Sequence, residues 1–250
     1  RNRDGRLTEE ITHHFRRVVP TGVFEVKKPK FSVPRAEGIM KTERFMLLSF
    51  LALISGCTSL QVGSDVAAGR RALLAGNNQT ALVYFQSAAQ KDPSYGWGTA
   101  YLQSVLIYVG RTDYSVGRLP QARETLEKAL IVHRDEDLTR LYLGLTLARS
   151  GERQAGLKEI ESGMKGIHAW LDYINEAHRF SFGQFWDPAR AIRSAIEGDL
   201  AIISGKEPDW EKLIASSEWI GKMMEEEGDK AARDEARERA RESDSSDSHP

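Results

Sequence analysis

The chain has 250 residues, of which 28% are charged and 40% hydrophobic, and its formal net charge is −1. This length and composition are typical of one globular domain with tails, and the single cysteine excludes an intrachain disulfide and a zinc site built from cysteines. Residues 57–250 hold 24 Lys and Arg against 30 Asp and Glu. An acidic body argues against a nucleic-acid-binding protein, whose affinity depends on neutralising phosphates.

The first 39 residues carry little structural information. They begin with Arg and show no sustained hydrophobic periodicity. His13 and His14 are candidate metal ligands, but adjacent histidines point away from each other on a helix, so the metal interpretation is weak. We expect residues 1–39 to be an upstream, non-native segment or a disordered extension, and we exclude them from the fold.

Residues 40–56 have the layout of a secretory signal peptide. Met40 starts a segment with two basic residues, Lys41 and Arg44; the almost wholly apolar residues 45–54 follow, and then two small residues. The apolar core of about 10 residues would be roughly 15 Å long as a helix, whereas a membrane span needs about 20 residues. The segment therefore predicts export rather than a stable transmembrane helix.

The sequence LISGC at 53–57 resembles the lipobox of bacterial lipoproteins. The resemblance implies a thioether-linked diacylglycerol on Cys57, cleavage before it and an acylated new amino terminus, with residues 57–61 as the lipidated linker. Thr58, where inner-membrane retention would use Asp, favours the outer membrane by resemblance to proteobacterial sorting. The competing interpretation is a buried cysteine at the end of a core helix. No cofactor is expected besides this covalent lipid.

Five positions then recur three times with the same internal spacing, the second copy 41 residues after the first and the third copy 34 residues after the second. Each copy predicts two helices, because an apolar helical stripe ends at a glycine and a second helix follows within a few residues. Pro120 fits the first turn of one such helix. The recurring residues are Gly69, Gly76, Ala81, Phe85 and Ala88; Gly110, Gly117, Ala122, Leu126 and Ala129; and Gly144, Gly151, Gly156, Ile160 and Gly163.

This pattern resembles the tetratricopeptide repeat, with copies at 62–95, 103–136 and 137–170. The resemblance implies an all-α fold, a TPR-like superhelix of about three helical hairpins over 62–170, with C-terminal capping helices over 171–224. Pro93 occupies the family's proline position, but Arg134 and His168 replace it in the later copies. The seven extra residues between the first two copies predict that the next helix begins early, near Ser94.

Two segments follow the repeats. Residues 180–186 crowd four aromatic side chains around Gly183, which predicts either a recognition loop or a hydrophobic plug that closes the last repeat. Asp187 should cap one helix, and a last helix should start near Asp209. Residues 225–250 show no apolar stripe and are expected to be a charged helical to disordered tail.

No phosphate-binding loop, nucleophile elbow or metalloprotease motif is found in the sequence. His168 and Asp172 are spaced to share a helix face, which is more typical of a surface hydrogen bond than of a catalytic dyad. We therefore expect a protein without enzymatic activity and without a metal site.

The family resemblance places a concave face on the first helix of each hairpin. We expect Arg70, Ile107, Arg111 and Tyr114 on this face to bind other envelope proteins or peptide segments; the same face could instead be filled by the chain's own C-terminal helices. The family's clamp for a peptide carboxylate is not supported, since only Arg70 is basic among the clamp positions. The predicted protein is held at the membrane through its lipid, on the periplasmic side of the outer membrane, and binds no nucleic acid. The rival hypothesis is an envelope enzyme or small-ligand binder centred on 180–186, which a pocket joining His178, Asp187 and the aromatics would support.

The lipobox generates the first testable prediction. When the chain is expressed from Met40 in a Gram-negative host, the mature form should begin at Cys57 and carry the mass of the added acyl chains, as measured by mass spectrometry. Cys57→Ser should abolish both acylation and cleavage by the lipoprotein peptidase. An unmodified Cys57 in the wild-type protein would contradict the prediction.

Overall fold

The structure is a computed structural model that describes residues 60–98, 100–205 and 208–246, with side chains up to residue 241. The chain divides into two compact units, Arg1–Leu53 and Ile54–Pro250, and every described residue belongs to the second. The predicted extension, the predicted signal peptide and Cys57 lie outside the described residues.

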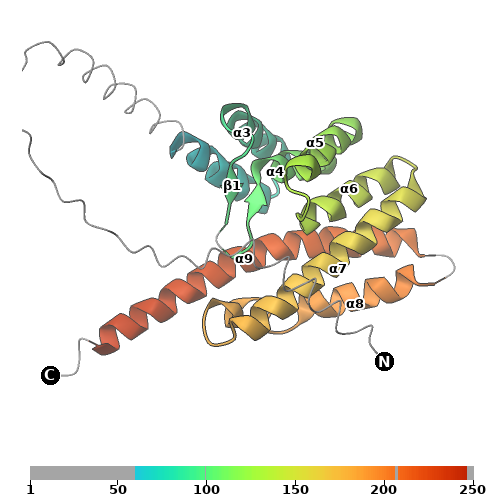
Figure 1. Cartoon of the computed structure of the whole chain (residues 1–250). Helices are drawn as coiled ribbons and strands as arrows, with labels where there is room; N and C mark the ends of the chain where they lie inside the picture. Colours follow the sequence, from blue (N-terminus) through green and yellow to red (C-terminus); the bar gives the residue numbers. More distant parts are fainter. Residues whose placement is uncertain (1–59, 99, 206–207, 247–250) are drawn as a thin grey trace, which may run out of the picture. The chain divides into compact units, whose positions relative to one another are not determined.

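The described part of the chain is helical apart from one small hairpin of two strands, which confirms the predicted all-α class (Figure 1). Its elements are a helix over residues 60–74, α3 (Asn78–Lys91), β1 (Gly96–Trp97), β2 (Gln103–Ser104), α4 (Val105–Ser115), α5 (Leu119–Val132), α6 (Asp137–Arg149), α7 (Arg153–Ala177), the 3-10 turn η1 (Phe182–Phe185), α8 (Ala191–Ile203) and α9 (Trp210–Ser246).

The first six helices form three hairpins: 60–74 with α3, α4 with α5, and α6 with α7. Each turn contains a predicted glycine in the left-handed conformation, Gly76, Gly117 or Gly151, with φ of 78°, 80° and 93°. The hydrogen bonds repeat as well: Asn77, Arg118 and Glu152 each donate a backbone N–H to the carbonyl five residues earlier. This is a Schellman ending, which satisfies carbonyls that the helix itself leaves free. Successive hairpins stack, α3 against α4 and α5 against α6.

Inside each hairpin, a glycine of the first helix faces a large residue of the second. A Cβ placed on Gly69 would lie 2.6 Å from the Phe85 ring, and one on Gly110 would lie 2.5 Å from the Leu126 side chain. In the third hairpin, a Cβ on Gly144 would lie 2.6 Å from the backbone nitrogen of Ile160. The large partners, and the alanines Ala81, Ala88, Ala122 and Ala129, are fully buried. The recurring positions of the sequence are therefore the contact positions of the hairpins.

The insertion between the first two hairpins is not a helical extension, so the expectation of a helix starting near Ser94 is wrong. The chain forms an antiparallel β1–β2 hairpin instead, with Trp97 opposite Gln103. Gly96 and Gly98 disfavour a helix here, and Gly98 adopts φ of +108°. Helix α4 begins only after Ser104, whose hydroxyl accepts a hydrogen bond from the Ile107 N–H at 3.3 Å.

The C-terminal helices begin near the residues that the sequence indicated. The Asp187 carboxylate accepts the backbone N–H groups of Ile192 and Arg193, at 3.0 and 3.2 Å, and so caps α8. The Asp209 carboxylate accepts the Lys212 N–H at 3.1 Å and caps α9. The apolar side of α9 is buried, and the helix packs against α6, α8 and η1.

Burial on α9 continues beyond Met224, where the charged tail was expected to begin. Glu225, Glu227 and Ala231 are all buried, and the helix runs on to Ser246. Hydrophobic periodicity does not reveal this part of the interface, because two of its buried side chains are acidic and are held by charged or polar partners.

The glycine contacts yield a prediction with an internal control. Gly144→Ala should lower the free energy of unfolding by about 1–3 kcal/mol, because the new Cβ would meet backbone atoms of Gly156 and Ile160 at 2.7 Å or less. Gly198→Ala, in α8, should raise it by about 0.5–1 kcal/mol, since nothing lies within 4 Å of the added Cβ. Urea denaturation of both variants measures the difference; equal effects would contradict the hairpin packing.

Candidate functional site

Helix α9 passes the first helices of the hairpins, 60–74, α4 and α6 (Figure 1). The side of these three helices that meets α9 is called the inner face below. Contacts from all three helices reach α9. Arg70 of helix 60–74 and Arg111 of α4 form ion pairs with it, and Gly221 of α9 lies against the Tyr142 ring of α6. The inner face is thus occupied by the chain's own C-terminal helix.

Glu225 is the centre of this contact. Its side chain is 1% exposed, and its Oε1 accepts hydrogen bonds from the Arg70 Nε and, at 3.3 Å, from the Tyr108 hydroxyl. Its Oε2 accepts from the Arg111 Nη1 at 2.9 Å and from the Gln103 Nε2 at 3.5 Å. One carboxylate therefore joins two guanidinium groups that belong to two different hairpins.

A second carboxylate completes the charge balance. Arg70 donates from Nη2 to Asp229, one helical turn beyond Glu225, at 2.7 Å. Arg111 donates from Nη2 to the Gly221 carbonyl, one turn before Glu225, at 3.3 Å. The two arginines and two carboxylates carry no net charge together, which is the condition under which charged groups are tolerated in a protein interior.

The electrostatic environment keeps these groups in the expected protonation states. Burial by itself would lower the pKa of Arg70, but Glu225, Tyr108 and Asp229 together outweigh it and the pKa is raised above its ordinary value. For Arg111 the same burial effect is outweighed by Tyr142, Glu225 and Tyr108 together, and its pKa is also raised. Burial, reinforced by Glu225, raises the pKa of Tyr108 well above its usual range. Both arginines remain cationic, and the tyrosine keeps the proton that it donates.

Aromatic rings hold the guanidinium groups in place. The Arg111 guanidinium lies 5.9 Å from the Tyr108 ring centroid and 5.0 Å from that of Tyr142. The Arg70 guanidinium lies 5.4 Å from the Trp97 ring centroid. A planar guanidinium can stack on a ring while it donates in its own plane, which a lysine ammonium cannot do.

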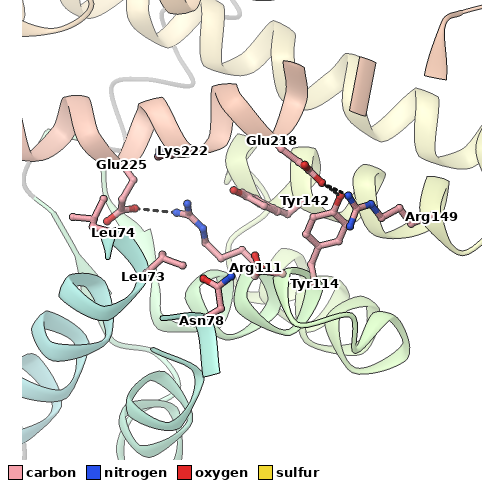
Figure 2. A pocket seen from close by; sticks show the side chains of 11 residues that line it. Leu73, Leu74, Asn78, Arg111, Tyr114, Tyr142, Arg149, Glu218, Lys222 and Glu225 are labelled. Carbon is pink, nitrogen blue, oxygen red and sulfur yellow. Dashed lines mark hydrogen bonds and ion pairs between the residues drawn. The ribbon is translucent and has the colours of Figure 1, made fainter. Parts of the chain in front are cut away.

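Glu218, nearly two turns before Glu225, makes a more exposed contact between α9 and the hairpins (Figure 2). It accepts from the Tyr114 hydroxyl at 2.5 Å and from Arg149 at 2.6 Å, and Arg149 lies over the Tyr114 ring at 4.7 Å. The Arg149–Glu218 pair is about 40% exposed on both sides. Breaking it should therefore cost only about 0–1 kcal/mol.

A cavity of about 360 Å³ remains between α9 and the inner face (Figure 2). Helix α9 contributes three charged side chains to it, and the inner face contributes Arg111, Tyr114 and Tyr142. The full lining is Leu73, Leu74, Asn78, Arg111, Tyr114, Ser115, Tyr142, Arg149, Glu218, Lys222 and Glu225. The inner face therefore has room for side chains larger than those that α9 supplies.

The four predicted partner-binding residues have clear positions. Arg70, Arg111 and Tyr114 contact acidic residues of α9 and are 9%, 4% and 2% exposed, whereas Ile107 is fully buried in the core. Of the two alternatives that the sequence left for this face, the structure contains the one in which a C-terminal helix fills it. Tyr108 and Tyr142 occupy positions of the family's carboxylate clamp but were not predicted to bind, and the three acids of α9 were missed. Their spacing was a usable signal, since Glu218, Glu225 and Asp229 recur at intervals of seven and four residues, which is one face of a helix.

The structure places His178, Asp187 and the aromatic residues of segment 180–186 against separate partners. His178 stacks on Phe182 at 4.4 Å, whereas Asp187 forms an ion pair with Arg193 at 3.0 Å. Trp186 packs edge-on against Trp170 at 4.7 Å, and Phe180 is 85% exposed. The segment therefore has a buried end at Trp186 and an exposed residue at Phe180.

His168 lies in an ion-pair network at the protein surface. Its two ring nitrogens lie 3.1 Å from Asp172 and 3.0 Å from Glu197, and both carboxylates are about half exposed. Among the residues that the structure describes, no group of three or more His, Cys, Asp and Glu is arranged to hold a metal ion. Within the same residues, no helix combines the length and apolar character needed to cross a bilayer.

Comparisons of the chain with protein-family models, curated proteins and solved structures find no match.

The buried ion pairs of Glu225 predict that two substitutions in the same interface will have unequal effects on stability. Glu225→Ala should cost about 3–5 kcal/mol of unfolding free energy, because it leaves Arg111 charged and buried without its counterion. Arg149→Ala should cost less than about 1 kcal/mol of unfolding free energy, because the Arg149–Glu218 ion pair is exposed. Thermal and urea denaturation measure both values, and a loss for Glu225→Ala no greater than for Arg149→Ala would contradict the account.

Proposed function

We propose that this chain is a scaffold of the tetratricopeptide-repeat type that binds acidic helical segments on its inner face. The observation that carries the proposal is the docking of α9, whose acids at 218, 225 and 229 each meet an arginine or tyrosine of the inner face. Helix-in-groove binding is a common mode of peptide recognition, in which anchors on one helix face set the specificity.

The repeat class is supported by the three hairpins, their equivalent glycine turns and their equivalent packing positions. An envelope location is supported by the signal-like segment 40–56 and the lipobox-like LISGC at 53–57. On this proposal a lipid on Cys57 anchors the scaffold to the periplasmic side of the outer membrane, where it holds other envelope proteins without catalysis.

Helix α9 acts in this proposal as a tethered competitor. A partner helix with acids at the same spacing presents the same chemistry to Arg70, Arg111 and Tyr114. Tethering gives α9 an effective concentration on the order of millimolar, so a free partner binds only if it has higher affinity or if α9 is released. Regulation of partner binding then reduces to the stability of the α9 contact.

The test uses a fluorescein-labelled peptide of residues 208–241 and the full chain. Fluorescence anisotropy should show at least tenfold tighter binding to the Glu225→Gln variant than to wild type, because loss of a charge-assisted hydrogen bond, about 1.5–3 kcal/mol, releases the tethered helix. Glu226→Gln is the matched control; its side chain is 41% exposed and pairs only with Lys222 in the described structure.

A second peptide, with Lys in place of the acids at 218, 225 and 229, should not bind to either protein. Circular dichroism confirms that both variants keep their helix content. Equal affinity of the native-sequence peptide for the wild-type and Glu225→Gln proteins, or equal binding of the acidic and lysine peptides, would overturn the proposed recognition.

A further inference from the structure

The β1–β2 hairpin forms one wall of a second cavity, of about 400 Å³, on the side of α9 beyond Glu225. Tyr95 and Trp97 line it from the hairpin strand region, Tyr101 from the turn, and Trp186 from the segment before α8. Of the residues that line the two cavities, Glu225 alone is common to both. The helical hairpins stack through their helices, so the residues of the β1–β2 insertion are not needed for that stacking and can line this cavity.

Small residues on α9 create the space. Gly228 and Ala232 face the aromatic wall, and a Cβ on Gly228 would come within 3.3 Å of the Trp186 ring. A glycine inside a helix costs about 1 kcal/mol relative to alanine. Gly228 therefore keeps the edge of Trp186 open to the cavity at a measurable cost in helix stability.

The polar groups of the cavity are neutral as a set. Arg70 lies between Glu225 and Asp229, and Arg111 balances the second negative charge from the other side of Glu225. The Arg70 guanidinium also covers the Trp97 ring, so the cation–π position is already taken. A cationic ligand would lose that position, and an anionic ligand would meet two carboxylates.

Two wall residues have a buried polar atom without a hydrogen-bond partner in the described part of the chain. These atoms are the Gln103 side-chain oxygen Oε1 and the Tyr101 hydroxyl. An unsatisfied buried acceptor costs about 1–3 kcal/mol. The Asp229 carboxylate, in contrast, is 30% exposed and can accept from a ligand at the rim.

We propose that this cavity binds a neutral pyranose ring of a carbohydrate. The C–H face of such a ring is apolar and weakly positive, which matches the negative face of an aromatic ring, while its hydroxyl groups both donate and accept. Packing against the aromatic wall would bury the ring face, and hydroxyl groups would bond to Asp229 and Arg70. A wholly apolar ligand would leave this polar rim desolvated without hydrogen bonds, which is unfavourable. The proposal does not depend on partner binding at the inner face.

Saturation-transfer NMR on the full chain tests the proposal with rings that differ in charge. Methyl α-D-glucopyranoside and N-acetylglucosamine should receive saturation, whereas cationic glucosamine and anionic glucuronate should bind at least tenfold more weakly. Open-chain sorbitol, which has hydroxyl groups but no ring face, should give no signal. Binding of sorbitol or glucuronate as strong as that of the glucoside would overturn the assignment.

Variants then locate the site. Trp97→Ala should weaken glucoside binding at least tenfold, and Ala232→Leu should block the cavity from α9. Ala236→Leu, one turn further along the exposed side of the same helix, is the matched control and should bind like wild type. Melting temperatures and hydrogen exchange along α9 confirm that each variant is folded and keeps α9 docked.

Two outcomes would contradict the proposal. One is unchanged glucoside binding in both Trp97→Ala and Ala232→Leu. The other is displacement of the glucoside by indole that binds at least tenfold more tightly than the glucoside, which would identify an apolar side-chain pocket instead. Neither outcome bears on the peptide experiment, so the two proposals fail independently.

Discussion

One buried carboxylate determines how this structure is assembled. Glu225 pairs with Arg70 from the first hairpin and with Arg111 from the second, Asp229 supplies the second negative charge, and the Glu225 side chain is only 1% exposed. Moving such charges out of water costs several kcal/mol each unless their partners are in place. A shift of α9 by one turn would move Glu225 away from both arginines and break these ion pairs. The position of α9 along the hairpins is therefore fixed by charge as much as by its apolar stripe.

This constraint connects the fold to the proposed functions. The hairpins alone would present two arginines and several tyrosines on one side, a combination that carries much of the energy in protein interfaces. In the described structure the acidic face of α9 satisfies these groups and leaves a cavity on each side of Glu225. The same side chains thus hold α9, limit access to the inner face and form the rim of the aromatic cavity.

The sequence predicted the parts of the fold that depend on neighbouring residues. Gly76, Gly117 and Gly151 mark the turns, and the matched pairs Gly69–Phe85 and Gly110–Leu126 are packing contacts, because hairpin partners lie within one repeat. The β1–β2 hairpin was missed because seven added residues fit two helical turns as well as they fit a short sheet. Glu225 was missed because it lies in the run EEEG, which has the composition of a solvated tail, while its partner Arg70 lies 155 residues away. Burial of a charge depends on such distant partners, and periodicity does not report them.

Hydrogen exchange along α9 tests the central claim most directly. If α9 is locked to the hairpins through Glu225, the backbone amides from Leu213 to Ala231 should exchange only with global unfolding, as slowly as those of α4 and α6. The amides beyond Ala232, which carry no buried side chain among the described residues, should exchange much faster. Uniformly fast exchange along α9, with α4 and α6 still protected, would show that the helix is not held by the inner face and would contradict the account.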